Sequence, residues 1–103
     1  MKYGTMIAAA LALMGVAASA SAGDAEAGRA KAATCIACHG PTGISVNPLW
    51  PNLAGQQEAY LAKQIQAFRD GTRSDPNMTA MVTALSDQDV ADLAAFFAAQ
   101  GCK

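Results

Sequence analysis

The chain has 103 residues, a length that fits one small domain and excludes a two-domain enzyme. Seven Lys and Arg against eight Asp and Glu leave a formal net charge of −1. This balance argues against nucleic acid as a partner, because nucleic-acid binding normally requires a basic face.

Residues 1–22 are expected to be a cleaved signal peptide. Lys2 supplies a positive start, an uninterrupted apolar run covers residues 6–18, and residues 20–22 form an Ala-Ser-Ala cleavage pattern. The alternative is an uncleaved membrane anchor, but the run is shorter than the roughly 20 residues that a spanning helix needs. We therefore expect export to the periplasm, without stable membrane insertion.

Cleavage would leave one domain, residues 23–103, with few side chains to fill its core. Only 18 of these 81 residues are large and apolar. A chain of this size buries only about 60–65% of its surface on folding, and such a domain usually needs a metal, a disulfide or a cofactor as well. The sequence should therefore hold one of these.

Three helices are predicted, and no alternating strand pattern is present. The first covers residues 24–38, with Asp24 as its N-cap, and its flat face of Ala and Gly is expected to pack against something bulky. The second covers residues 57–70 and has an apolar stripe. The third runs from Ser86 or Asp87 to about residue 100 and opens with a capping-box pattern. The chain therefore reads as all-α.

The two segments between these helices are expected to be loops. Residues 40–55 contain three prolines and three glycines, and a loop of that length in a small domain is typical of a chain that wraps around another group. Residues 72–85 contain Pro76 and two methionines, Met78 and Met81.

The strongest chemical signal is the run Cys35-Ile36-Ala37-Cys38-His39. Two thiols three residues apart on a helical turn can each add to a vinyl group of one haem, and the adjacent histidine then ligates the iron. A zinc site would need two more Cys or His ligands, a thioredoxin-like pair should begin a helix after a strand, and a plain disulfide gives the histidine no role. The run therefore predicts one covalently bound haem c.

Within this interpretation His39 is the first axial ligand, and its second ring nitrogen should donate to a backbone carbonyl. The sequence has no second histidine, so the other ligand is expected to be a methionine. Position alone favours Met78, in the expected loop, over Met81, which is nearer an apolar stretch and suits the core. Both stay open on these grounds. Apolar side chains around the haem should raise its reduction potential, and the candidates are Ile44, Leu53, Leu61, Ile65, Phe68 and Leu93.

Beyond the C-x-x-C-H run, several segments carry a family resemblance. These are residues 23–25 leading to Gly28, the Pro-Asn-Leu-Ala-Gly segment within residues 47–56, residues 60–61 and 68–71, and the Leu-Ser-Asp start and apolar pattern within residues 85–97. On these residues the chain resembles bacterial class I c-type cytochromes. It is nearest the short periplasmic monohaem type, which is also similar to each half of the dihaem cytochromes of the c-four type. The match covers essentially all of residues 23–103.

The resemblance implies a small class I cytochrome c fold, with three to five helices wrapped around one covalently attached haem. It implies Met78 as the axial ligand in preference to Met81, because the family ligand typically lies seven residues before the hydrophobic residue that precedes Ser-Asp, here Leu85. It also implies that the carbonyl of Pro51 accepts the proton of the His39 ring. Gly28 would let the first and last helices cross closely, with Phe96 as its aromatic partner.

The resemblance further implies an electron carrier and not an enzyme. Such a carrier would exchange single electrons in transient encounters with an oxidase, reductase or dehydrogenase, and we expect a monomer. Three alternatives stay open: a haem subunit of a larger periplasmic oxidoreductase, a gas-binding or peroxidatic haem protein if no methionine ligates, and a non-haem redox or scaffold module. Arg73 is the candidate for a contact with a haem propionate, against the alternative of a solvated surface arginine. Cys102 is a lone third thiol, expected in a non-essential tail, with a link to another chain as the alternative.

Overall fold

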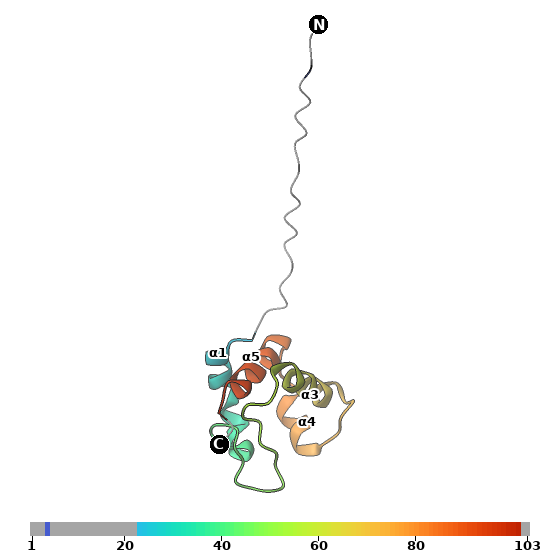
Figure 1. Ribbon diagram of the computed structural model, residues 1–103. Coiled ribbons are helices and arrows are strands. Elements are labelled where there is room, and N and C mark those ends of the chain that lie inside the picture. The colour runs from blue at the N-terminus through green and yellow to red at the C-terminus, as the bar shows by residue number, and fades with distance from the viewer. Residues whose placement is uncertain (1–3, 5–22, 102–103) are drawn as a thin grey trace.

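A computed structural model describes Gly4 and residues 23–101 (Figure 1). Cys102 and the expected cleavage site of the signal peptide lie outside the described residues. The described part is all-α, as predicted, and contains no strand. None of its helices is both long and apolar enough to cross a membrane. Its elements in chain order are α1 (Ala25–Lys31), the 3₁₀ helix η1 (Ala32–Thr34), α2 (Ile36–His39), α3 (Glu58–Asp70), α4 (Pro76–Val82) and α5 (Asp87–Ala98).

The prediction of one continuous helix over residues 24–38 is wrong. Asp24 does cap α1, since its side chain accepts hydrogen bonds from the N–H groups of Glu26 and Ala27. The chain then tightens into η1, where the N–H of Cys35 donates to the carbonyl of Ala32 at 2.8 Å. A 3₁₀ helix has 3.0 residues per turn and an α-helix has 3.6. The side chains of α2 therefore point in other directions than they would if α1 continued as one α-helix.

The prediction of a loop over residues 72–85 is also wrong, because α4 lies within it. Asp75 caps this helix by accepting from the N–H groups of Asn77 and Met78 at 2.9 and 3.1 Å. Pro76 takes the first helical position, where its fixed φ fits and its missing N–H costs nothing. Pro76 is therefore part of a helix start.

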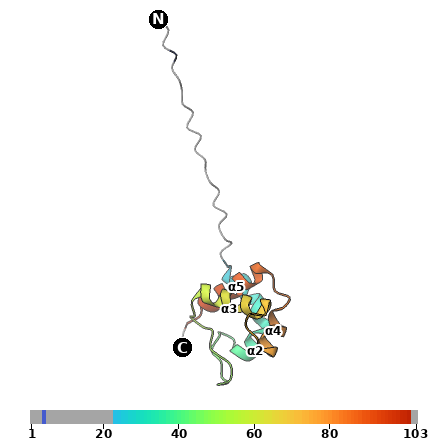
Figure 2. The same cartoon turned by 90° about the vertical axis from the view of Figure 1, so that its right-hand side faces the viewer.

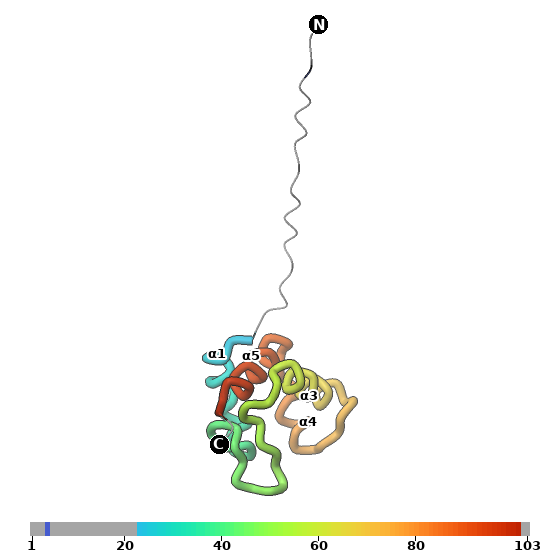
Figure 3. Tube along the Cα trace, in the orientation of Figure 1, coloured from blue at the N-terminus to red at the C-terminus, as the bar shows by residue number. Residues whose placement is uncertain are grey.

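Helix α5 lies at the centre of the fold, between α1 on one side and α3 on the other (Figures 1 and 3). It opens with the predicted capping box of Ser86 and Asp89. Helix α4 packs against α3, and α2 and α4 lie below the other helices, on opposite sides of the view in Figure 1. Figure 2 shows the same arrangement from the side.

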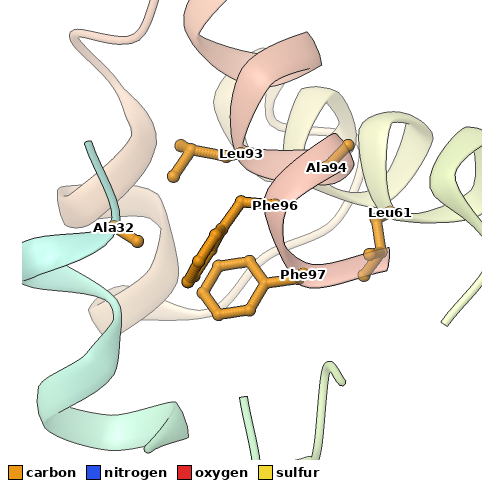
Figure 4. Packing of buried hydrophobic residues seen from close by; sticks show 6 residues of the cluster. All are labelled: Ala32, Leu61, Leu93, Ala94, Phe96 and Phe97. Carbon is orange, nitrogen blue, oxygen red and sulfur yellow. The ribbon is translucent and has the colours of Figure 1, made fainter. Parts of the chain in front are cut away.

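The flat face of α1 packs against α5, which is the bulky partner that the sequence predicts for it. A Cβ added to Gly28 would lie 2.0 Å from the carbonyl oxygen of Asp92 and 2.8 Å from the Cβ of Phe96, so only glycine lets the two backbones approach this closely. The predicted close crossing at Gly28 beside Phe96 is confirmed. Next to it the rings of Phe96 and Phe97 meet edge to face, with centroids 5.0 Å apart. Figure 4 shows these rings with the other buried members of the core, Ala32, Leu61, Leu93 and Ala94.

A buried carboxylate also joins α1 to α5. Asp92 is 2% exposed and accepts from the N–H of Asp24 at 2.8 Å, from Lys31 Nζ at 2.6 Å and from Gln88 Nε2 at 2.7 Å. The hydrogen bond from the Asp24 backbone, followed by those from Lys31 and Gln88, lowers the pKa of Asp92 to about 2. The donors come from Asp24 and Lys31 at α1 and from Gln88 of α5, so the buried carboxylate is fully hydrogen-bonded where the two helices cross.

Candidate functional site

Helix α2 places the two cysteines and the histidine on one short turn. The N–H of His39 donates to the carbonyl of Cys35 at 2.9 Å, and the N–H of Gly40 donates to the carbonyl of Ile36 at 2.9 Å. Cys35 and Cys38 are both half-buried and both are free thiols. Burial raises the pKa of the Cys35 thiol, although a hydrogen bond with Thr34 opposes the shift, so this thiol is protonated near neutral pH.

The orientation and the tautomer of the His39 ring follow from one hydrogen bond. The side chain is 6% exposed, and its Nδ1 lies 2.8 Å from the carbonyl oxygen of Pro51. A carbonyl can only accept, so Nδ1 carries the proton and the neutral ring keeps a lone pair on Nε2. No described residue hydrogen-bonds Nε2. The contact that the resemblance implied is therefore present, and it leaves the second nitrogen available as a ligand.

Residues 40–55, here called the histidine loop, hold Pro51 in place through a narrow base. The carbonyl of Gly43 accepts from the N–H groups of Leu53 and Ala54 at 2.7 and 3.1 Å. The N–H of Ser45 donates to Asn52 Oδ1 at 2.7 Å. These bonds join residues 43–45 to residues 52–54, directly after Pro51, and so limit the movement of the Pro51 carbonyl.

The histidine loop is also attached to its surroundings. The hydroxyl of Ser45 donates to the carbonyl of Cys38 at 3.3 Å, and the N–H of Gly55 donates to the carbonyl of Phe97 at 3.0 Å. Gly40 adopts a φ of +85°, and a Cβ there would lie 2.0 Å from the carbonyl oxygen of Ile44. The loop has no charged side chain, and at its tip Val46 is 99% and Leu49 83% exposed. A shallow, open hollow at this tip is lined by Ser45, Val46, Asn47, Pro48, Trp50 and Asn52.

Residues 71–86, here called the methionine segment, contain both candidate methionines. Met78 is half-buried, whereas Met81 is 53% exposed. Both belong to α4, three residues apart, so the side chain that was expected in a loop is presented by a helix. Of the seven residues of α4, only Val82 is buried.

Two arginines lie near the start of the methionine segment. Arg69, the penultimate residue of α3, donates from Nη1 to the carbonyl of Leu85 at 3.2 Å, and its Nη2 lies 2.8 Å from Asp87 Oδ1. Arg73 is exposed; its guanidinium lies over the Phe68 ring, 4.4 Å from the centroid, and donates to Gln64 Oε1 at 2.9 Å. The predicted contact of Arg73 with a propionate therefore stays a prediction, and these two contacts would compete with it.

The predicted apolar surroundings divide into two groups. Leu61, Phe68 and Leu93 are buried, whereas Ile44, Leu53 and Ile65 are half-buried, and Leu53 and Ile65 pack against the core cluster. Sequence reasoning missed the contributions of Asp75, Arg69 and Asn52. The Asp-Pro pair at residues 75–76 was a readable signal for a helix start. The contacts of Arg69 and Asn52 span 16 and 7 residues and follow no local pattern.

Comparison with known proteins gives consistent findings. The family Cytochrome c matches residues 25–100. Cytochrome c4 of Pseudomonas aeruginosa is 58% identical over 80 residues, which are 78% of this chain and 40% of that protein. Cytochrome c-554(548) of Halomonas halodenitrificans is 50% identical over 82 residues, which are 77% of this chain and 99% of that protein. The crystal structure of reduced cytochrome c4 from Pseudomonas stutzeri superposes with a TM-score of 0.75 at 48% identity, over 78% of this chain and 47% of that one. The chain thus spans about two fifths to one half of the cytochrome c4 proteins and almost all of the Halomonas protein.

Proposed function

The chain belongs to the cytochrome c family, and from this premise we propose that it is a one-electron carrier whose haem iron is held by His39 and Met78. Members of this family bind haem c covalently, and the described residues contain one C-x-x-C-H run. In the proposal Cys35 and Cys38 form the two thioether bonds.

The residues present suit this cofactor. Two free thiols lie on one helical turn beside a buried imidazole. The hydrogen bond from His39 Nδ1 to the carbonyl of Pro51 is the observation that carries the proposal, because it orients the ring and leaves Nε2 as the nitrogen that can ligate. The second ring nitrogen is then the atom that a ligated iron would use.

When bound, the haem supplies an iron that gains and loses one electron. The chain's own part is to hold both axial positions, with His39 on one side and Met78 on the other, so that no position is left for a substrate. This supports a carrier and argues against an enzyme. Half-buried apolar residues that pack against the core, such as Leu53 and Ile65, would disfavour the more charged oxidised iron and raise the reduction potential.

We also propose a periplasmic location, with cleavage of a signal peptide after residue 22. Two observations support a domain that begins at Gly23. The family match starts at residue 25, and a Cβ on Gly23 would lie 1.9 Å from the carbonyl oxygen of Ala91. Gly23 therefore already packs closely against α5. The partners in this proposal are redox proteins met in brief encounters by a monomer.

The test starts from protein purified from the periplasm. Its mass should equal residues 23–103 plus one haem, and a bare peptide mass would overturn the proposal. Oxidised wild-type protein should show the sulfur-to-iron charge-transfer absorption of a bound thioether. Met78→Ala should abolish this absorption, and the matched variant Met81→Ala should keep it. Loss only in Met81→Ala would assign the other methionine. Carbon monoxide binding by the wild type would instead favour a gas-binding or peroxidatic protein.

A further inference from the structure

The side chain of Arg69 connects the two ends of the methionine segment. Arg69 lies just before the segment begins, and its guanidinium reaches the residues where the segment ends. Nη1 donates to the carbonyl of Leu85 at 3.2 Å, and Nη2 lies 2.8 Å from Asp87 Oδ1. A weaker contact of 3.4 Å joins Nε to Asp70. One guanidinium therefore bridges the last turn of α3 and the first turn of α5.

Helix α4, which carries Met78, has few other attachments: it packs against α3, and Arg73 contacts Phe68 and Gln64 of α3. The helix has seven residues, too few to be stable alone, and Val82 is its only buried residue. Gly71, at the start of the segment, has no neighbour within 4 Å of an added Cβ. The Arg69 side chain, in contrast, is only 19% exposed, and its bond to the Leu85 carbonyl is partly buried. The attachment of the two ends therefore limits how far α4 can move.

The chemistry of arginine suits this bridge. Its planar guanidinium presents donors in a fixed fork, so that one side chain bonds a carbonyl and a carboxylate at the same time. Asp87 also raises the pKa of Arg69, so the guanidinium keeps its charge. A lysine offers a single ammonium on a flexible stem and would reach one acceptor or the other.

We propose that Arg69 is a positioning residue for the axial methionine: by fixing both ends of the methionine segment, it keeps Met78 within reach of the iron. This inference rests on the proposed function, because it requires Met78 as the ligand. Arg69 acts through the segment ends and makes no contact with the haem in this account.

The test measures how easily added imidazole displaces the thioether from the oxidised, haem-loaded protein. Imidazole binds only when the methionine has left, so its apparent affinity reports the population of the detached form. Arg69→Met removes the bridge and should tighten imidazole binding about tenfold, the effect of losing one hydrogen bond to a charged group. Arg69→Lys keeps the charge and should fall between Arg69→Met and the wild type.

Lys31→Met is the matched control, since Lys31 also bridges two carboxylates, Asp89 and Asp92, but joins α1 to α5. It should lower the thermal unfolding temperature and leave imidazole affinity unchanged. Imidazole affinity within twofold of wild type in Arg69→Met would overturn the inference, and so would an equal rise in Lys31→Met. If Arg69→Met does not fold, Arg69→Lys and Asp87→Ala carry the same comparison.

Failure of the proposed function has a separate signature. In that case wild-type protein lacks the charge-transfer absorption, or Met78→Ala leaves imidazole affinity unchanged. A wild type that shows the absorption, together with an Arg69→Met variant of unaltered affinity, refutes the role of Arg69 alone.

Discussion

The histidine loop and the methionine segment have the same length and are held in different ways. The histidine loop is closed by backbone bonds at Gly43 and anchored to α5 through the carbonyl of Phe97. The methionine segment depends more on side chains: the Asp75 cap within it, the contacts of Arg73 with α3, and the Arg69 bridge between its ends. One backbone bond, from the N–H of Arg73 to the carbonyl of Ala67, also joins it to α3. Almost any residue can form a backbone hydrogen bond, whereas a single substitution can remove a side-chain hydrogen bond.

This difference indicates that the two axial ligands are not equally secure. The His39 ring is buried and hydrogen-bonded to a fixed carbonyl, so its release requires the loop to open. Met78 is half-buried on a helix with one buried residue, so its release requires only local movement. We therefore expect substitutions in the methionine segment to alter ligand exchange, and substitutions in the histidine loop to alter global stability.

The largest effect is expected from a matched pair of glycines. Gly40 and Gly71 have nearly the same φ, +85° and +83°, but an added Cβ meets the Ile44 carbonyl oxygen at 2.0 Å at the first and nothing within 4 Å at the second. Gly71→Ala should cost about 1 kcal/mol from the left-handed backbone alone. Gly40→Ala should cost about 3 kcal/mol or more, because the loop must also shift. Urea unfolding of both variants measures this, and equal losses would contradict the close packing of the histidine loop.

A smaller effect is expected from removing a helix cap in the methionine segment. Asp75→Ala leaves the N–H groups of Asn77 and Met78 without an acceptor and should cost about 1 kcal/mol of stability in α4. Imidazole affinity should rise about fivefold, the equivalent of that free energy. Asp24→Ala is the control, since Asp24 caps the equally long helix α1 in the same way. A similar rise in that variant would show that the effect is not local.

The matching substitution in the histidine loop is Asn52→Ala. It removes the acceptor for the N–H of Ser45 and should lower the free energy of unfolding by about 1 kcal/mol, with imidazole affinity unchanged. Asn52→Asp keeps an acceptor oxygen at this position and should lose less. Chemical denaturation measures the free energy of unfolding, and imidazole titration of the same samples measures release of the methionine. Tighter imidazole binding in Asn52→Ala would contradict the expected difference between the histidine loop and the methionine segment.

The smallest effect near neutral pH concerns Asp92, which lies outside both regions and joins α1 to α5. Its pKa is lowered to about 2, so the stability it contributes is complete above its ordinary pKa of 3.8 and is lost as the pH falls toward 2. The urea midpoint should therefore fall between pH 4 and pH 2, and hardly change between pH 5 and pH 7. Asp92→Asn should be less stable at pH 5 and lose part of this pH dependence. A wild-type midpoint that stays constant down to pH 2 would contradict the lowered pKa.

Local signals made α3 and α5 predictable to within one or two residues. The apolar stripe marks both, Gly71 follows the last residue of α3, and the Ser86 capping box opens α5. The Ala-rich first segment carried no such boundary, so the change to a 3₁₀ turn at Ala32 could not be read from it. Helix α4 was missed because seven residues are too few to show a clear apolar periodicity, although Pro76 after Asp75 is typical of a helix start.

The candidate site was predictable where its chemistry is contiguous in sequence. The C-x-x-C-H run names the attachment turn and the histidine by itself. The partner of the histidine ring, Pro51, lies 12 residues away and followed only from the resemblance. Contacts such as Arg69 with Leu85 depend on how α3 and α5 pack, and composition and periodicity say nothing about that geometry.

The bond between the N–H of Asp24 and Asp92 spans 68 positions, and it bears on how the chain acquires its shape during synthesis. A nascent chain that stops short of Asp87 already contains the whole attachment motif but has no partner on which α1 can pack. Truncation before the last helix should therefore yield a polypeptide without a core. In the growing chain, the two thiols and the imidazole stay accessible until the final dozen or so residues close the structure over them.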